Sequence, residues 1–464
     1  MRHDCDVTVV GGGISGLAAA WYMRRSGLSV RVLERGSAPG GTIGTIEDGG
    51  WRIEKGPNSA LETTPLFGEM FEALGITADR IYADPAADRR YILRGGRLHA
   101  LPMSPGAFIA SPLWTARGKL RLLKEPLVGR AAAEESVAGF VARRLGREFL
   151  DYAINPFVAG VYAGDPERLS VRAAFPKLYA LEARYGGLVR GMIGGARERR
   201  ARAEKAKDRA KMFSFRTGMQ ALPRALAAAL GDAVDLGAEA DRVESSADGF
   251  TVRYKRLGRA CALRSRAAVV AVPAYAAGGL VSRIAPGAGA LLGAIPYPPV
   301  TEVFLGYPRG AIGRPLDGFG YLVPEKEQRS TLGTIWSSAL FPGRAPEGHA
   351  ALTTFVGGSR QPSLAALDDD ALTRAVTADL RAVMGLRGEP VYRRIFRWER
   401  AIPQYAIGHL DLMGKLSECE ERVPGLFFCG NYRGGIALGD CLMSAEALAR
   451  RIREFVKTNN NQQS

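Results

Sequence analysis

Three glycines near the start of the chain, Gly11, Gly13 and Gly16, have a spacing that suits phosphate binding. They follow a strand-like stretch over residues 6–10 and open a helix-like, alanine-rich stretch over residues 14–20. The first glycine of such a pattern permits a tight turn, the second lets the backbone approach a pyrophosphate, and the third lets helix pack closely on strand. The helix N-terminus presents free N–H groups to the phosphates. The pattern therefore predicts a dinucleotide-binding site.

An acidic residue stands where such a site would need one. A second strand-like stretch over residues 30–33 ends at Glu34, 18 residues after Gly16. At that distance a carboxylate can accept a hydrogen bond from a ribose hydroxyl. These residues leave both NAD and FAD open, and a glycine-rich turn in an ordinary α/β unit is the alternative. No second glycine fingerprint follows a strand, so a reductase with two nucleotides is not expected.

The elements that must position these groups come from both ends of the chain. Residues 425–441 read as strand, glycine loop and the start of a helix, which we expect over residues 440–456. An apolar run over residues 267–272 predicts a fully buried strand. We therefore expect a discontinuous nucleotide-binding domain, with insertions at roughly residues 85–212 and 290–395.

Charge and length limit the other functions. The 464 residues suffice for two or three domains, and 63 Lys+Arg against 47 Asp+Glu give a formal net charge of +16. Residues 190–211 hold nine of the basic residues and three acidic ones, and residues 119–124 mix basic with apolar side chains. This pattern favours an anionic membrane surface, with a solvated charged face as an equal alternative. Nucleic acid is not expected, because no aromatic residues alternate with the basic ones.

Metal binding and membrane spanning are not indicated. Five cysteines are scattered without zinc-like spacing, and four histidines form no recognisable group. No run approaches the roughly 18 apolar residues that a spanning helix needs. We expect a cytoplasmic protein, peripheral on the inner face of the cell membrane.

Further motifs resemble a known family. The pair Gly40-Gly41 after Glu34, together with the Gly430-Asn431 loop, resembles the FAD-dependent amine oxidase superfamily. Within that superfamily, five separated motifs are similar to those of the protoporphyrinogen oxidases. They lie at residues 89–102, 155–170, 318–324, 332–344 and 398–409.

The resemblance implies an α/β fold with three parts. The first is a Rossmann-type FAD-binding domain like that of p-hydroxybenzoate hydroxylase and the amine oxidases, over residues 1–85, 213–290 and 395–464. The second is a mixed α+β substrate-binding domain. It covers residues 86–100 and 291–394. The third is a helical, basic, membrane-binding domain over residues 101–212.

The resemblance also implies the reaction. It is the six-electron oxidation of protoporphyrinogen IX to protoporphyrin IX in heme biosynthesis, with dioxygen as acceptor. FAD would be bound non-covalently, because Cys441 follows Gly439-Asp440 and not the Ser-Gly-Gly of covalent monoamine oxidases. The flavin carries the chemistry, so we assign no catalytic side chain. The alternatives are a coproporphyrinogen III oxidase, an amine oxidase or carotenoid desaturase, and a non-catalytic flavin-binding membrane scaffold. A homodimer stays open.

The resemblance assigns substrate contacts to five residues. Arg90 would bind a propionate, with Arg89 as the competitor that strand alternation sends to the opposite face. Leu322 and Phe341 would be apolar walls, and Gly160 and Gly164 would let the main chain approach the macrocycle. Val243 would contact adenine through its main chain. All the residues expected to bind FAD are Gly11, Gly13, Ile14, Ser15, Gly16, Glu34, Arg35, Gly40, Gly41, Thr42, Gly56, Pro57, Asn58, Ser59, Val243, Trp398, Gly430, Asn431, Gly434, Ile436 and Leu438.

Overall fold

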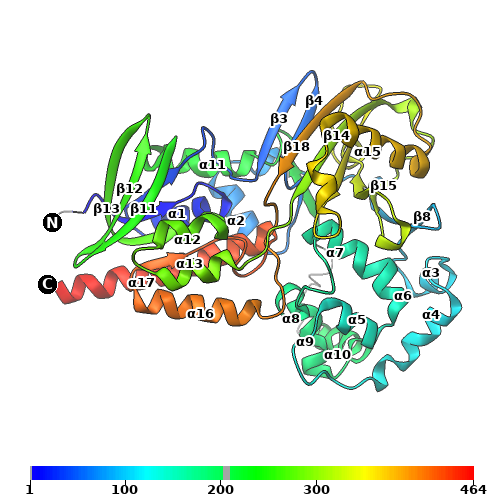
Figure 1. Ribbon diagram of the computed structural model, residues 1–464, viewed down its shortest axis with the longest axis horizontal. Coiled ribbons are helices and arrows are strands. Elements are labelled where there is room, and N and C mark those ends of the chain that lie inside the picture. The colour runs from blue at the N-terminus through cyan, green and yellow to red at the C-terminus, as the bar shows by residue number, and fades with distance from the viewer. Residues whose placement is uncertain (1–2, 202–209, 464) are drawn as a thin grey trace.

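A computed structural model describes residues 3–201 and 210–463. Its first sheet joins the two ends of the chain, which both lie at the left of Figure 1. The strand order is β10-β2-β1-β13-β12-β11, with β19 paired to β13. Neighbours among β10, β2, β1, β13 and β19 run parallel, and β11 to β13 form an antiparallel meander. The strands are β1 (Cys5–Val10), β2 (Val30–Glu34), β10 (Val234–Leu236), β11 (Ala238–Ser246), β12 (Gly249–Arg256), β13 (Arg259–Val270) and β19 (Leu426–Phe428).

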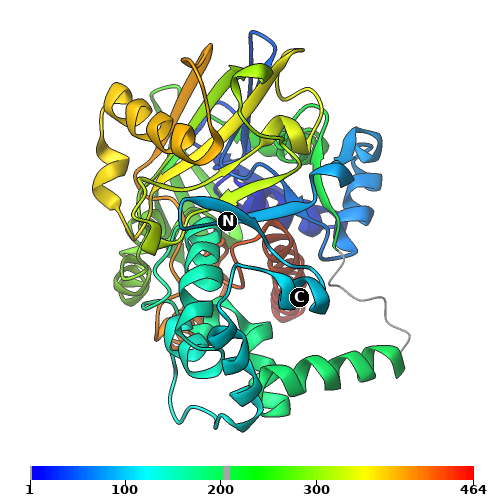
Figure 2. The ribbon, with the colours of Figure 1, turned by 90° about the vertical axis from the view of Figure 1, so that its right-hand side faces the viewer.

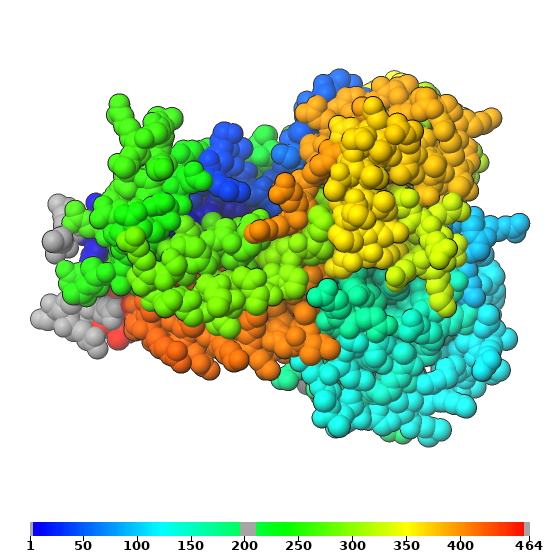
Figure 3. Space-filling model, in the orientation of Figure 1, coloured from blue at the N-terminus to red at the C-terminus, as the bar shows by residue number. Residues whose placement is uncertain are grey.

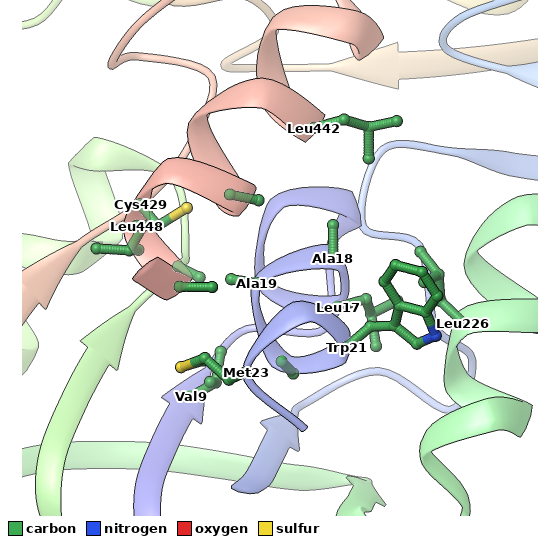
Figure 4. Close-up of a cluster of buried hydrophobic side chains, with 14 of the residues drawn as sticks. Val9, Leu17, Ala18, Ala19, Trp21, Met23, Leu226, Cys429, Leu442 and Leu448 are labelled. Carbon is green, nitrogen blue, oxygen red and sulfur yellow. The ribbon is translucent and has the colours of Figure 1, made fainter. Parts of the chain in front are cut away.

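Helices cover both faces of this sheet because its strands alternate between two apolar cores. Val7 and Val9 of β1 pack in one core, and Val10 packs in the other. Figure 4 shows the first core, where α1 lies between α11 and α17. The helices of the first core are α1 (Ile14–Arg25), α2 (Leu66–Ala73), α11 (Ala221–Leu230) and α17 (Leu438–Gln463), and those of the second are α12 (Ala274–Val281), α13 (Pro286–Gly293) and α16 (His409–Arg422).

The second sheet lies at the upper right of Figure 1. Its order is β18-β14-β17-β16-β15-β7-β8, antiparallel except for the parallel pair β15 and β7. Helix α15 (Asp369–Met384) packs on one face through an apolar core. The strands are β7 (Arg89–Arg94), β8 (Arg97–Ala100), β14 (Val300–Pro308), β15 (Gly318–Leu322), β16 (Thr331–Ile335), β17 (His349–Gly357) and β18 (Tyr392–Trp398).

Short elements connect the two sheets. A hairpin of β3 and β4 and a small sheet in the order β5-β9-β6 follow the first glycine segments. Helix α14 precedes Phe341. These elements are β3 (Gly44–Asp48), β4 (Trp51–Lys55), β5 (Ala60–Leu61), β6 (Arg80–Tyr82), β9 (Met212–Phe215) and α14 (Ser337–Leu340).

A helical segment lies below the second sheet, in cyan and green in Figure 2. It has its own apolar core and a buried ion pair between Arg144 and Glu125. Within residues 3–201 and 210–463, no helix is both long and apolar enough to cross a membrane. The helices of this helical segment are α3 (Pro105–Ala110), α4 (Ala116–Arg121), α5 (Val137–Arg144), α6 (Arg147–Phe149), α7 (Asn155–Tyr162), α8 (Val171–Ala174), α9 (Pro176–Tyr185) and α10 (Leu188–Ala201).

The structure refines several expected elements. Helix α17 begins at Leu438, two residues before the expected start, and extends past the expected end at residue 456. Residues 119–124 do not form one amphipathic helix, because α4 ends at Arg121 and a 3-10 helix, η3 (Leu122–Leu127), follows. Part of the basic stretch at residues 190–211, namely residues 202–209, lies outside the described residues. β18 crosses the expected boundary at residues 394–395, and the division into three domains stays a prediction.

Candidate functional site

The first glycine turn has the geometry that each of its glycines needs. Gly11 has φ +114°, and a Cβ there would lie 2.7 Å from the carbonyl oxygen of Ala271. A Cβ on Gly16 would overlap the carbonyl oxygen of Gly11, so α1 packs directly against the turn. A Cβ on Gly13 would meet no atom within 4 Å, which leaves open space at the N-terminus of α1. Free N–H groups and open space at one helix end suit a phosphate.

Two further glycine segments contact this turn in series. Gly40 has φ +128°, and its N–H donates to the carbonyl of Gly12 at 2.9 Å. A Cβ on Gly41 would lie 3.2 Å from the Cα of Gly13. A Cβ on Gly56 would lie 2.5 Å from the carbonyl oxygen of Thr42. We call the three segments, residues 11–16, 40–42 and 56–59, the glycine cradle.

The Glu34 side chain hydrogen-bonds the backbone of the cradle. Its carboxylate accepts hydrogen bonds from the N–H groups of Gly12 at 2.6 Å and Gly36 at 2.7 Å. These bonds fix the loop on either side of the second strand, so the carboxylate holds main chain whether or not a ribose also binds it. The contact with a ribose hydroxyl remains a prediction, as does any contact by the exposed Arg35.

The C-terminal loop after β19 is held by an aromatic pair. The Tyr405 hydroxyl donates to the carbonyl of Asn431 at 2.7 Å and accepts from the N–H of Gly435 at 2.9 Å. The His409 ring stacks on Tyr405, with ring centroids 4.1 Å apart, and its Nε2 donates to the carbonyl of Tyr432 at 3.0 Å. Burial lowers the pKa of His409 below its ordinary value, which favours the neutral ring. The loop around Gly434 is thus fixed from the side of α16.

The remaining expected cofactor residues differ in their surroundings. Trp398, at the end of β18, has a buried Nε1 that meets no hydrogen-bond partner among the described residues. Val243 is fully buried in the second core, so only its main chain is available to a ligand. Ile436 packs against the core of the helical segment, and Leu438 packs against the first core. The open space at Gly13 and the unpaired Trp398 donor are observations that a bound flavin nucleotide would fit.

The two candidate propionate ligands, Arg89 and Arg90, lie in different surroundings. β7 pairs with β15 so that Arg90 lies opposite Gly320, and Ile92 lies opposite Leu322. Ile92 packs into the core of the helical segment, so Arg90, two residues earlier, belongs to the same face. Arg89 forms an ion pair with Asp317 at 2.7 Å. Arg90 is exposed and has no acidic partner among the described residues.

Helix α7 faces this side of the second sheet. A Cβ on Gly160 would lie 2.5 Å from Cδ2 of Leu322. The same helix leaves Phe157 and Val161 exposed by 42% and 40%. We call Arg90, Leu322, Phe157, Gly160 and Val161 the Arg90 region. In Figure 3 the second sheet sits directly above the helical segment that carries α7.

Gly164 and Phe341 lie outside this region. A Cβ on Gly164 would lie 2.5 Å from Oε1 of Gln404. Phe341 is buried and packs with Ile81 and Leu340 in a cluster separate from that of Leu322. Phe341 and Leu322 thus belong to different apolar clusters, and their roles as walls of a substrate site stay predictions.

A buried polar cluster behind Phe341 was missed by the sequence reasoning. Glu54 forms an ion pair with Arg344 at 2.8 Å and accepts hydrogen bonds from the Thr45 hydroxyl and the Met219 N–H. Arg344 also donates to Ser214. The cluster lines a small cavity together with Asn58 and Phe341. The sequence did carry a signal for this cluster, because Arg344 is the last residue of the motif at residues 332–344.

A second missed residue is Glu302 on β14. It is a charged residue type within a run of buried positions, residues 300–307. Its Oε2 accepts a hydrogen bond from the N–H of Gly56 at 3.1 Å. In the part of the chain that the structure describes, no group of His, Cys, Asp and Glu side chains could hold a metal ion.

Comparisons with known proteins agree with this geometry. A model of the family "Flavin containing amine oxidoreductase" matches residues 14–453. The chloroplastic protoporphyrinogen oxidase of Oryza sativa subsp. japonica is 35% identical, over 98% of this chain and 89% of the rice protein. The coproporphyrinogen III oxidase of Bacillus subtilis (strain 168) is 28% identical, over 95% of this chain and 96% of its own.

Solved structures confirm the fold. A protein of Exiguobacterium sp. 255-15, provisionally named a protoporphyrinogen oxidase, has a TM-score of 0.80 at 23% identity, over 98% of this chain and 99% of its own. Reduced UDP-galactopyranose mutase has a TM-score of 0.74 at 16% identity, over 97% of each chain. The expected Rossmann-type flavoprotein fold, with mixed sheets and helices, is thereby confirmed. The chain belongs to the flavin-containing amine oxidoreductase family and is an oxidoreductase similar to the protoporphyrinogen oxidases.

Proposed function

We propose that this protein oxidises protoporphyrinogen IX to protoporphyrin IX, as a step of heme biosynthesis. FAD is the non-covalent cofactor and dioxygen the final acceptor. The observation that carries the proposal is Arg90, an exposed guanidinium without an acidic partner, on the sheet face that meets the apolar surface of α7. The names of the rice and Bacillus relatives support a porphyrinogen as the substrate class.

The reaction removes six hydrogens from the macrocycle. Bound FAD supplies two-electron oxidation, so each porphyrin requires three rounds. Three dioxygen molecules take up the six electrons and six hydrogens and leave as three molecules of hydrogen peroxide. A methylene bridge between two pyrroles is a good hydride donor and aromatisation drives the reaction, so we assign no side chain as acid or base.

The residues of the chain bind and orient the substrate. The Arg90 guanidinium presents two parallel donors, which match one propionate carboxylate. Leu322, Phe157 and Val161 offer apolar surface to the flat rings. Gly160, which has no side chain, lets the backbone of α7 come close to that surface.

One guanidinium at Arg90, unpaired among the described residues, suits one propionate of a dicarboxylate, whereas the tetracarboxylate coproporphyrinogen III would need further cations. Arg94 forms an ion pair with Glu148, and Lys326 forms one with Asp151. Both of these cations are thus paired with acids of the helical segment. Coproporphyrinogen III remains the alternative substrate.

The helical segment is proposed to bind an anionic membrane surface from the cytoplasmic side. Ile109, Leu123 and Leu127 are exposed by 73%, 74% and 84%, and Lys124 beside them is exposed. Apolar side chains next to a cation suit a lipid interface. Anionic vesicles should sediment the protein at low salt and less of it at high salt. If vesicles sediment no protein at any salt concentration, this surface is a solvated charged face. Whether the protein is a homodimer is decided separately, by measuring its molecular mass in solution.

Turnover of the two porphyrinogens tests the proposal. We expect porphyrin fluorescence to rise with protoporphyrinogen IX, with about three dioxygen molecules consumed per porphyrin. A higher kcat/KM with coproporphyrinogen III than with protoporphyrinogen IX would show that coproporphyrinogen III is the preferred substrate. No porphyrin from either compound, with FAD intact, would contradict the proposal and favour a non-catalytic flavoprotein.

A further inference from the structure

Glu302 is a carboxylic acid in the interior of the second sheet. It lies on β14, where every residue but the last is buried, and its own exposed fraction is 1%. Its neighbours on the adjacent strands are Phe355 of β17 and Phe396 of β18. Strand packing alone would be served by an apolar residue here, so a buried carboxyl group needs another explanation.

The carboxyl group contacts the third segment of the glycine cradle. Its Oε2 accepts from the Gly56 N–H at 3.1 Å, and the Asn58 side chain lies near enough to the same carboxyl group to lower its pKa. Asn58 also donates to the carbonyl of Gly56 at 3.1 Å. Oε1 is buried and has no partner among the described residues. One half of the group thus fixes the loop, and the other half is free to carry a hydrogen.

The surroundings favour the neutral acid. Arg344 is paired with Glu54, and no ion pair to Glu302 exists within residues 3–201 and 210–463. An ionised carboxylate would therefore be buried without compensation, close to a second acid. Burial, and to a smaller extent the charge of Glu54, raise the pKa of Glu302 to about 8.

The contact reaches the dinucleotide turn through close backbone contacts. A Cβ on Gly56 would lie 2.5 Å from the carbonyl oxygen of Thr42, and a Cβ on Gly41 would lie 3.2 Å from the Cα of Gly13. Glu302 stands at the far end of this series, on the sheet that carries Leu322. A displaced Gly56 would press on Thr42, because no gap separates them.

We propose that Glu302 is a positioning residue that holds the Gly56–Ser59 loop against the rest of the glycine cradle with an uncharged carboxyl group, and so links the second sheet to the flavin site. The inference rests on the proposed FAD site. The Gly56 N–H would bind an ionised carboxylate more strongly, so a loss of loop order would come from the uncompensated buried charge beside that of Glu54. FAD affinity should then fall as the pH rises through about 8.

FAD binding to the apoprotein tests this inference without relying on turnover. The dissociation constant would be measured by quenching of FAD fluorescence from about pH 6.5 to about pH 9.5, for the wild type, Glu302→Gln, Glu302→Met and Asp379→Asn. Gln keeps an acceptor and cannot ionise, whereas Met fills the volume and leaves the Gly56 N–H unpaired. Asp379, a buried acid that accepts from Thr331, is the matched control on α15.

We expect wild-type affinity to fall about tenfold across this range and Glu302→Gln to stay flat. Glu302→Met should bind about tenfold more weakly at low pH, with an altered visible spectrum of the bound flavin. Asp379→Asn should follow the wild type. The inference about Glu302 is overturned, and the proposed FAD site is not, if FAD affinity of Glu302→Gln falls with pH as steeply as that of the wild type. The same holds if Glu302→Met binds FAD as tightly as the wild type. If Glu302→Met does not fold, the other two profiles decide. Failure of the wild-type apoprotein to bind FAD would overturn the proposed cofactor with it.

Discussion

The glycine cradle is formed mainly by backbone atoms, whereas the Arg90 region is formed mainly by side chains. The cradle is main chain in close contact, where an added Cβ at Gly11, Gly16 or Gly56 would meet a carbonyl oxygen at 2.7 Å or less. The Arg90 region is made of side chains with exposed surface, such as Phe157 and Arg90 itself. At these three glycines of the cradle a side chain would clash with backbone, whereas Arg90 and Phe157 can be replaced without moving the backbone.

The largest expected effect comes from breaking a buried ion pair next to the third segment of the glycine cradle. Arg344→Met removes the cation paired with Glu54 and leaves a buried carboxylate uncompensated. We expect a loss of about 3–5 kcal/mol in the free energy of unfolding, measured by denaturant titration. Arg52→Met, which removes an ion pair to the exposed Glu47, should cost under about 1 kcal/mol. Equal losses in the two variants would contradict the account.

The next effect separates space from packing within the cradle. In Gly16→Ala the new methyl group overlaps the carbonyl oxygen of Gly11, so we expect a loss of about 3 kcal/mol in stability and little bound FAD. Gly13→Ala has room for its methyl group in the free protein. It should therefore unfold like the wild type and yet bind FAD more weakly. Calorimetry and flavin content check both, and normal FAD binding by Gly13→Ala would place the cofactor elsewhere.

The Arg90 region should respond in binding and not in stability. Arg90→Ala removes the proposed propionate partner, so KM for the porphyrinogen should rise about 10-fold or more while the melting temperature is unchanged. Arg89→Ala breaks only the partly exposed pair with Asp317 and should change KM less than about twofold. Steady-state kinetics with both variants decide. A larger effect at Arg89 would exchange the two roles.

The smallest effect concerns the loop held by Tyr405. The pKa of the buried His409 lies below its ordinary value of 6.5 in the folded protein, so between these two values the unfolded chain binds the extra proton. Stability contributed by the neutral ring is present above about pH 6.5 and is lost as the pH falls below it. His409→Gln should reduce this acid destabilisation in thermal melts. An unchanged acid slope would show that other groups cause it.

The cradle was predictable from the sequence because its rules are local. A glycine needed for a tight turn, an acid after the next strand and a helix starting at Ile14 all lie within a few tens of residues. The apolar spacing of α17 was also predictable, and Leu442 and Leu448 do lie in the first core (Figure 4).

The rest depends on strand register and on partners far apart in the chain. The choice between Arg89 and Arg90 needed the pairing of β7 with β15, more than 200 residues later. The contact of Glu302 with Gly56 and the pair of Glu54 with Arg344 join elements that no local pattern connects. Phe341 and Leu322 were both expected to be apolar walls of the substrate site, and no local pattern shows that they pack in different clusters.

The most direct measurement of the central claim is an anaerobic titration of the FAD-loaded protein with protoporphyrinogen IX. Flavin absorbance and porphyrin fluorescence are followed together, so that dioxygen cannot intervene. The account predicts that the flavin is bleached and that about one porphyrin forms for every three flavins reduced. Intact, oxidised FAD with no porphyrin formed, in a protein that is folded and saturated with substrate, would contradict it.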